Sequence, residues 1–150
     1  MPPGPTSEGL LLLRLVAAAV LAAVLGWERE RAGKAAGLRT HMLVGLAAAL
    51  YTSLGQLTLG DYAPSELGLR ADPIRVIQAV ALGVGFLGGG VITASSGNGR
   101  DSGLTTAASI WSTAAIGIAT GMGHYVLAAG ATALQLIVVW GLFRVERAIE

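Results

Sequence analysis

The segment that decides the fold runs from residue 26 to residue 43 and reads GWERERAGKAAGLRTHML. It holds four of the chain's ten Lys and Arg residues, and it lies between two long apolar runs. A short basic connection between apolar runs is typical of a membrane hairpin whose loop stays in the cytoplasm. The segment therefore predicts two membrane spans and the direction in which they cross.

The composition agrees with a chain that lies mostly in lipid. Hydrophobic residues make up 53% of the 150 residues and charged residues 13%, whereas soluble domains carry about 25% charged residues. The 22 glycines fit membrane helices, in which small residues let backbones approach. The net charge of +1 argues against a nucleic-acid partner, and the lack of cysteine excludes disulfides.

Five apolar runs are long enough to span a bilayer, which takes about 20 residues. Each is predicted to be a helix, because backbone polar groups must be paired in lipid. The first run follows residues 1–9, which carry no Lys or Arg, so it is expected to be a retained span and not a signal peptide. The prediction is one all-α transmembrane domain over residues 1–150, a five-helix bundle with spans at about 10–27, 42–59, 74–93, 104–122 and 125–143.

Lys and Arg are distributed unequally between the two sides of this bundle. When the loops are assigned alternately, one side receives only Arg70 and Arg75. The positive-inside rule makes the other side cytoplasmic, with the N-terminus outside and the C-terminus inside. The cations on the cytoplasmic side are Arg29, Arg31, Lys34, Arg39, Arg100, Arg144 and Arg147.

Arg14 lies inside the first span, and an arginine at the bilayer centre costs about 2.5–3.5 kcal/mol on insertion scales. Its side chain can snorkel to the outer interface. Alternatively, it can face inward and pair with a carboxylate such as Asp61 or Asp72. Asp72 is also expected to cap the third span, because Pro73 follows it at the first helical position.

One face of the third span carries Arg75, Gln78, Leu82, Gly85 and Gly89 by helical spacing. A glutamine in lipid needs a hydrogen-bond partner, so this face is expected to pack inside the bundle. The fourth span has a hydroxyl-rich face, which can line a polar path but is expected to serve packing, since hydroxyls commonly bond the carbonyl one turn back.

A second polar group lies at the cytoplasmic edge, where the first span ends and the second begins. The second and fourth spans open similarly, with Gly-Leu-Arg-Thr and Gly-Leu-Thr-Thr, so both bring hydroxyls to this edge. The expected cluster is either a charge network that holds the hairpin or a docking patch. Its members are Glu28, Arg29, Arg39, Thr40, Thr105 and Thr106.

No nucleophile–base pair, phosphate loop or metal-ligand spacing is visible in the sequence, so no enzyme activity, catalytic residue or cofactor is expected. Magnesium prefers carboxylate oxygens, and no predicted span interior holds a carboxylate. The sequence therefore argues against a dedicated metal site within the membrane.

Several separated motifs occur in a specific order along the chain. They are Gly26-x-Glu28-Arg29, the segment 36–44, Asp72-Pro73-x-Arg75-x-x-Gln78, the segment 85–92 and the segment 103–111. With these motifs the chain resembles the MgtC/SapB family of bacterial inner-membrane proteins over nearly its whole length. The resemblance implies a five-span protein, in a form without the soluble C-terminal domain of many members.

The resemblance also implies a role in growth at low magnesium and in survival inside host cells. A family without evident transport chemistry suits a regulator of another membrane machine, such as a cation pump or an F-type ATP synthase. A bundle this small is expected to form a homo-oligomer or to bind a partner. The alternative is a small ion or solute transporter or channel, with a pathway along Arg14, Arg75, Gln78 and the hydroxyl face.

Overall fold

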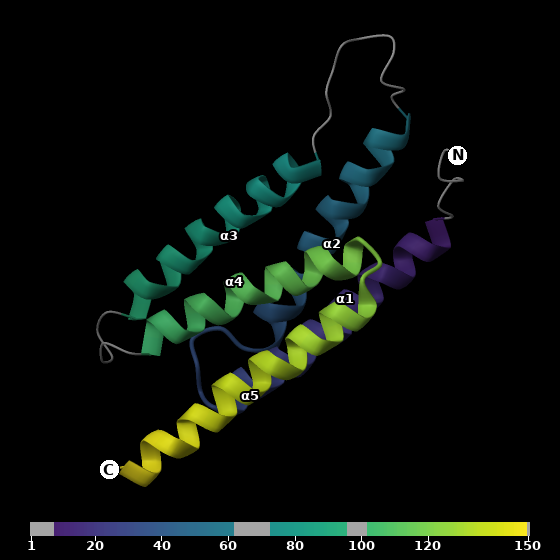
Figure 1. Cartoon of the computed structure of the whole chain (residues 1–150). Helices are drawn as coiled ribbons and strands as arrows, with labels where there is room; N and C mark the ends of the chain where they lie inside the picture. Colours follow the sequence, from purple (N-terminus) through teal and green to yellow (C-terminus); the bar gives the residue numbers. More distant parts are fainter. Residues whose placement is uncertain (1–7, 62–72, 96–101, 150) are drawn as a thin grey trace.

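The computed structural model describes residues 8–61, 73–95 and 102–149 together with the short connections within them, and every regular element in this part of the chain is an α-helix (Figure 1). The all-α prediction is confirmed for these residues. Each predicted span lies within one helix, except that residue 122 follows the end of the fourth. The helices are α1 (Glu8–Arg31), α2 (Leu38–Asp61), α3 (Pro73–Ser95), α4 (Ser102–Gly121) and α5 (Tyr125–Ile149).

Two hairpins, α1–α2 and α4–α5, are set by glycines that end the first helix of each. Gly33 and Gly123 have φ angles of +63° and +85°, a left-handed conformation in which glycine avoids the Cβ clash. The N–H groups of Gly33 and Lys34 donate to carbonyls in the last turn of α1 at 3.0 Å. The N–H groups of Gly123 and His124 do the same after α4, at 2.9 Å.

The α4 helix lies at the centre of the bundle and contacts all four other helices (Figure 1). Among the described residues, α3 contacts only α2 and α4, while α5 contacts only α1 and α4. Ile110, Ala114 and Ile118 of α4 pack toward α2 and α3. Ile116 packs on the other side against Leu25 and Ala128, so α4 is enclosed on opposite faces.

Close backbone approach joins α4 to α2. A Cβ atom at Gly117 would collide with the carbonyl oxygen of Gly45, and one at Gly121 would lie 2.7 Å from the carbonyl oxygen of Ala49. The two glycines are four residues apart and therefore share one face of α4. Gly117-x-x-x-Gly121 is thus a helix-packing motif.

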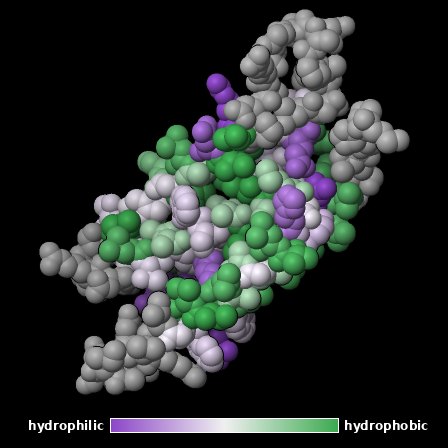
Figure 2. All heavy atoms as spheres, viewed as in Figure 1, coloured by the Kyte–Doolittle hydropathy of each residue, from purple (hydrophilic) through white to green (hydrophobic). Residues whose placement is uncertain are grey.

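The bundle buries polar side chains among its small apolar ones and exposes large apolar side chains. Buried polar side chains include His41, Thr106, Thr113 and Thr120, each 0% exposed. Large apolar side chains lie on the outer faces of α1, α3 and α5, and Figure 2 shows patches of hydrophobic residues between paler and hydrophilic ones on the visible face. Phe86, for example, is 85% exposed. A protein that buries hydroxyls and exposes large apolar side chains is suited to lipid as its solvent.

Two helices are long and apolar enough to cross a membrane, Glu8–Arg31 and Ile74–Ser95. Only 28% and 17% of their apolar windows are buried, whereas the core helix of a soluble protein is mostly enclosed. The third apolar helical stretch, Tyr125–Gly141, is shorter. The hydroxyls, glycines and alanines that let α2 and α4 pack centrally also lower their hydropathy. The number of spans and their direction therefore stay predictions.

The contact between α4 and α2 can be tested with a methyl group. Gly117→Ala is expected to lower the free energy of unfolding by about 1–3 kcal/mol, because the added carbon overpacks against the backbone of α2. Gly130→Ala is the matched control, since nothing lies within 4 Å of a Cβ at Gly130, and it should stabilise α5 by up to about 1 kcal/mol. Thermal unfolding in detergent, followed by circular dichroism, measures both. Equal behaviour of the two variants would contradict the close approach.

Candidate functional site

A chain of side-chain hydrogen bonds crosses the bundle from α2 through α4 to α5. His41 Nε2 lies 2.9 Å from Ser109 Oγ, and Gln135 Nε2 donates to the same oxygen at 3.1 Å. Ser112 Oγ donates to Gln135 Oε1. We call His41, Ser109, Ser112 and Gln135 the central network.

The carbonyl of Gly37 fixes the direction of these bonds. A carbonyl only accepts, so His41 Nδ1, 2.8 Å away, carries the proton. In a neutral imidazole the Nε2 atom then accepts from the Ser109 hydroxyl. Each donor in the central network thus meets an acceptor, which is the condition for a buried polar network to stabilise a structure.

Ser109, His41 and the Gly37 carbonyl have the arrangement of a nucleophile, a base and a group that orients the base. Their burial argues against catalysis, because His41 is 0% and Ser109 4% exposed. A substrate would have to displace a helix to reach the hydroxyl. The geometry therefore favours a structural role, in which the hydrogen bonds hold α2, α4 and α5 in register, over a catalytic role.

Arg14 lies at the opposite end of the bundle from the α1–α2 loop and faces inward. Its Nη1 atom donates to the carbonyl oxygen of Gly121 at 2.9 Å and to Gln56 Oε1 at 3.0 Å. Gly121 is the last residue of α4, where carbonyls lack helical partners and a cation is favourable. The side chains of Asp61 and Asp72, the expected carboxylate partners, lie outside the described residues.

At the edge near the α1–α2 loop, Arg29 is only 4% exposed and pairs with Glu28. The neighbouring Glu30 carboxylate accepts the N–H of Leu38 at 2.7 Å and so caps the start of α2. A carboxylate at a helix N-terminus satisfies an orphan N–H and the helix dipole. No pattern in the sequence had indicated this capping role of Glu30.

The cluster expected at this edge is only partly formed. Glu28 and Arg29 meet, but Arg39, Thr40 and Thr105 are exposed, so they do not join it. The reason is the helical period. Successive side chains on a helix point about 100° apart, so when His41 faces α4 the side chains of Arg39 and Thr40 point in other directions. On α4, Thr106 is buried while Thr105 faces outward.

The expectation that the face of α3 with Arg75, Gln78, Leu82, Gly85 and Gly89 packs inside the bundle is wrong for the single chain. All five residues are exposed, and nothing lies within 4 Å of a Cβ at either glycine. The helix instead buries an apolar heptad-like face. That face consists of Ile77, Val80, Val84, Gly88 and Val91, offset by two residues, or about half a turn.

Other buried hydroxyls on α2, α4 and α5 bond along their own helices. Thr52, Thr113, Thr120 and Thr132 each donate to the carbonyl four residues earlier, at 2.7–2.9 Å. These bonds agree with the packing interpretation of the hydroxyl face. In the described part of the chain, no group of three or more His, Cys, Asp or Glu residues is placed to hold a metal ion.

His41 and Gln135 are the central residues that sequence reasoning missed. His41 lies inside the quoted motif 36–44, and Gln135 is a polar residue within the apolar run of the fifth span. An isolated amide in such a run requires a hydrogen-bond partner on another helix. That signal could have identified Gln135, but only the packing of α4 identifies Ser109 as its partner.

The central network predicts non-additive substitutions. Ser109→Ala and Gln135→Leu should each lower the free energy of unfolding by about 1–3 kcal/mol, because each leaves a buried polar group unpaired. The double variant should lose less than the sum, since both remove the same hydrogen bond. Thr105→Ala, on the exposed side of α4, is the control and should change stability by at most about 0.5 kcal/mol. Additive losses in a denaturation assay would argue against the network.

Comparison with known proteins places this arrangement in a family. The model of the MgtC family matches residues 15–148. The chain is 40% identical over 143 residues to Protein SrpB of Synechococcus elongatus, which covers 91% of this chain and 77% of that protein. No solved structure matches the chain.

Two further relatives are longer proteins. The chain is 41% identical over 129 residues to the Putative magnesium transporter YhiD of Escherichia coli, covering 85% of this chain and 58% of YhiD. It is 38% identical over 125 residues to Protein MgtC of Salmonella typhimurium, covering 83% of this chain and 49% of MgtC. The chain thus spans about half the length of these two relatives. Since the family match takes in nearly all of the described helices, the chain belongs to the MgtC family of membrane proteins.

Proposed function

We propose that this chain is a multi-pass protein of the bacterial inner membrane, with five spans, that binds another membrane protein and regulates it. It has no catalytic activity or cofactor of its own in this proposal. The family resemblance suggests a cation pump or an F-type ATP synthase as the partner. It also suggests growth at low magnesium and survival inside host cells as the setting.

The observation that carries the proposal is the contrast between a closed interior and an open α3 face. Inside, the central network and Arg14 bond to groups of the same chain. Outside, Gln78 is exposed and makes no hydrogen bond with a described residue, and Gly85 and Gly89 have open space beside them. A glutamine on the same helix face as two open glycines supports docking of a further transmembrane helix, from a partner or a second copy.

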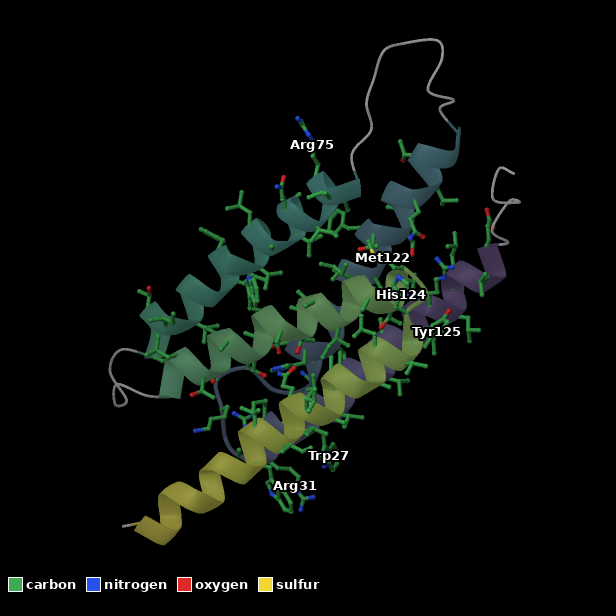
Figure 3. The ribbon with its side chains drawn as sticks, in the orientation of Figure 1. Trp27, Arg31, Arg75, Met122, His124 and Tyr125 are labelled. Atoms are coloured by element: carbon green, nitrogen blue, oxygen red, sulfur yellow. The ribbon has the colours of Figure 1, made fainter. Side chains whose placement is uncertain are left out.

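The proposed orientation places the α1–α2 loop in the cytoplasm. Figure 3 supports two interfacial ends, since Trp27 and Arg31 lie toward one end of the bundle and Arg75, His124 and Tyr125 toward the other. The Arg31 guanidinium lies 6.0 Å from the ring centre of Trp27, within cation–π range. Trp and Tyr collect at membrane interfaces.

The orientation can be measured with single cysteines, because the chain has none. In intact spheroplasts, a membrane-impermeant maleimide should label Ser65→Cys at once and Lys34→Cys only after permeabilisation. Ser65 lies in the expected outer loop, outside the described residues, and Lys34 follows the end of α1. Labelling of both positions from the same side would contradict five alternating spans.

A second candidate function is transport. The name of the Escherichia coli relative, Putative magnesium transporter, favours it, and the polar network through the bundle could line a path. The two functions differ in what the purified protein does alone. A transporter moves solute across a sealed membrane without a partner, whereas a regulator does not.

We therefore expect purified protein in sealed liposomes to show no Mg²⁺ or monovalent-cation flux above that of empty liposomes. Crosslinked capture from native membranes should instead retain a membrane protein or a second copy. Gly89→Leu should lower that retention about tenfold by filling the α3 face. Gly130→Leu, at a position on α5 with equally open space, should leave the amount of captured partner unchanged. Flux that Arg14→Leu abolishes, without any captured partner, would favour transport.

A further inference from the structure

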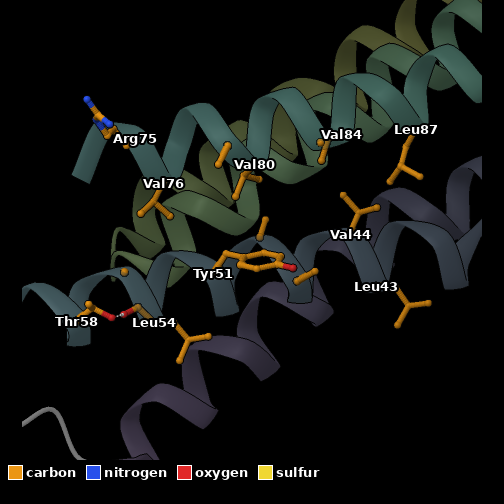
Figure 4. A pocket seen from close by; sticks show the side chains of 15 residues that line it. Leu43, Val44, Tyr51, Leu54, Thr58, Arg75, Val76, Val80, Val84 and Leu87 are labelled. Atoms are coloured by element: carbon orange, nitrogen blue, oxygen red, sulfur yellow. Dashed lines mark hydrogen bonds between the residues drawn. The ribbon is translucent and has the colours of Figure 1, made fainter. Parts of the chain in front are cut away.

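A groove of about 810 Å³ runs between α2 and α3 (Figure 4). Figure 4 shows Arg75 and Thr58 at one end and Leu43 and Leu87 at the other. Apart from Tyr51, Thr58 and Arg75, its walls consist of aliphatic side chains and glycine. Such a surface excludes polar ligands along most of its length and accepts a hydrocarbon chain.

The length of the groove matches one leaflet of a bilayer. From Arg75 to Leu87 the α3 helix rises by about 18 Å at 1.5 Å per residue. Half of a typical hydrocarbon core is about 15 Å. An extended acyl chain lying in the groove would therefore run from the membrane surface to the bilayer centre.

The two ends of the groove differ in charge. Arg75 is exposed and forms no hydrogen bond or ion pair with a described residue, and Figure 4 shows its guanidinium directed away from α2 at the end of the groove. Its aliphatic stem can line the groove while the cation stays at the membrane surface. Guanidinium binds phosphate with paired, charge-assisted hydrogen bonds.

We propose that this groove binds a phospholipid with an anionic headgroup, its acyl chain against Val76, Val80 and Val84 and its phosphate at Arg75. The lipid comes from the leaflet that Arg75 faces, whichever side of the membrane that is. The proposal rests on the membrane setting and not on the regulatory function.

A second helix fits the groove less well than an acyl chain does. A Cβ atom at Gly55 would lie 2.8 Å from Val76, so α2 and α3 touch at the Arg75 end. A helix is about 10 Å wide with its side chains and would rest across this contact instead of entering. A flexible hydrocarbon chain can follow the remaining space.

Native mass spectrometry of the purified full chain tests the proposal. Palmitoyl-oleoyl phosphatidylglycerol and phosphatidylcholine are added in equal amounts to protein in mild detergent. We expect one retained phosphatidylglycerol and at least a tenfold preference over phosphatidylcholine. Arg75→Gln should reduce this preference about tenfold, the size expected for a lost charge-assisted hydrogen bond. Arg39→Gln, an exposed arginine on α2, should leave it unchanged.

Substitutions at two glycines of α3 can distinguish binding in the groove from binding elsewhere on this helix. Gly83 lines the groove and Gly85 does not, yet both have open space around a Cβ. Gly83→Leu should lower retention of both lipids about tenfold, whereas Gly85→Leu should retain them. Equal retention by the two variants, or equal retention of the two lipids by the unaltered chain, would overturn the proposal. Loss of dimers in place of lipid in Gly83→Leu would assign the groove to a second copy. If Gly83→Leu does not fold, Arg75→Gln decides alone.

Discussion

The close contact between α2 and α4 is the constraint on which the rest of the structure depends. In lipid, apolar side chains gain little by leaving their solvent, so helices associate through close packing and hydrogen bonds. Gly117 and Gly121 let the two backbones meet at carbonyl oxygens of α2. That approach brings His41 within 2.9 Å of Ser109, and it leaves the other faces of α4 free to hold α1, α3 and α5.

Two helix ends are stabilised by charged side chains whose sign is opposite to the partial charge of that end. Glu30 accepts an N–H at the start of α2, and Arg14 donates to a carbonyl at the end of α4. Each charge therefore stabilises a helix dipole and an orphan backbone group together. Because α1 carries both residues, this one helix fixes the ends of two others, and its own outer face is left apolar for lipid.

The proposed lipid and partner contacts therefore both use the outer surface. Most buried polar side chains of the described residues bond within the chain, Arg14 Nε and Ser53 Oγ excepted, whereas α3 presents Gln78 to the outside and Arg75 at the end of an apolar groove. The relatives YhiD and MgtC are longer than this chain, and the matched parts cover 58% and 49% of them. The surfaces described here belong to the part that these relatives share with it.

Several features of the fold and of the candidate site followed from sequence alone. Apolar runs predicted the five helices, because helix formation depends on local periodicity. A Gly-x-x-x-Gly spacing occurs both at the packed Gly117 and Gly121 and at the open Gly85 and Gly89, so that spacing alone did not decide which helix faces meet. The motifs predicted the MgtC family. The position of Arg14 inside an apolar run, and of Glu28 and Arg29 at the end of that run, marked these three as polar residues that require partners inside or beside a membrane.

Only the tertiary structure decided which partners those residues and the remaining polar side chains have. Gln78 faces outward and Gln135 inward, although both are single amides in apolar helices, since α3 lies at the edge of the bundle and uses its valine face for packing. Likewise His41, and not Arg39 or Thr40, meets α4, because the rotation of α2 about its axis is set by its contacts with Gly117 and Gly121. The sequence determines the helical period, whereas packing against the neighbouring helices determines how far each helix is rotated about its own axis.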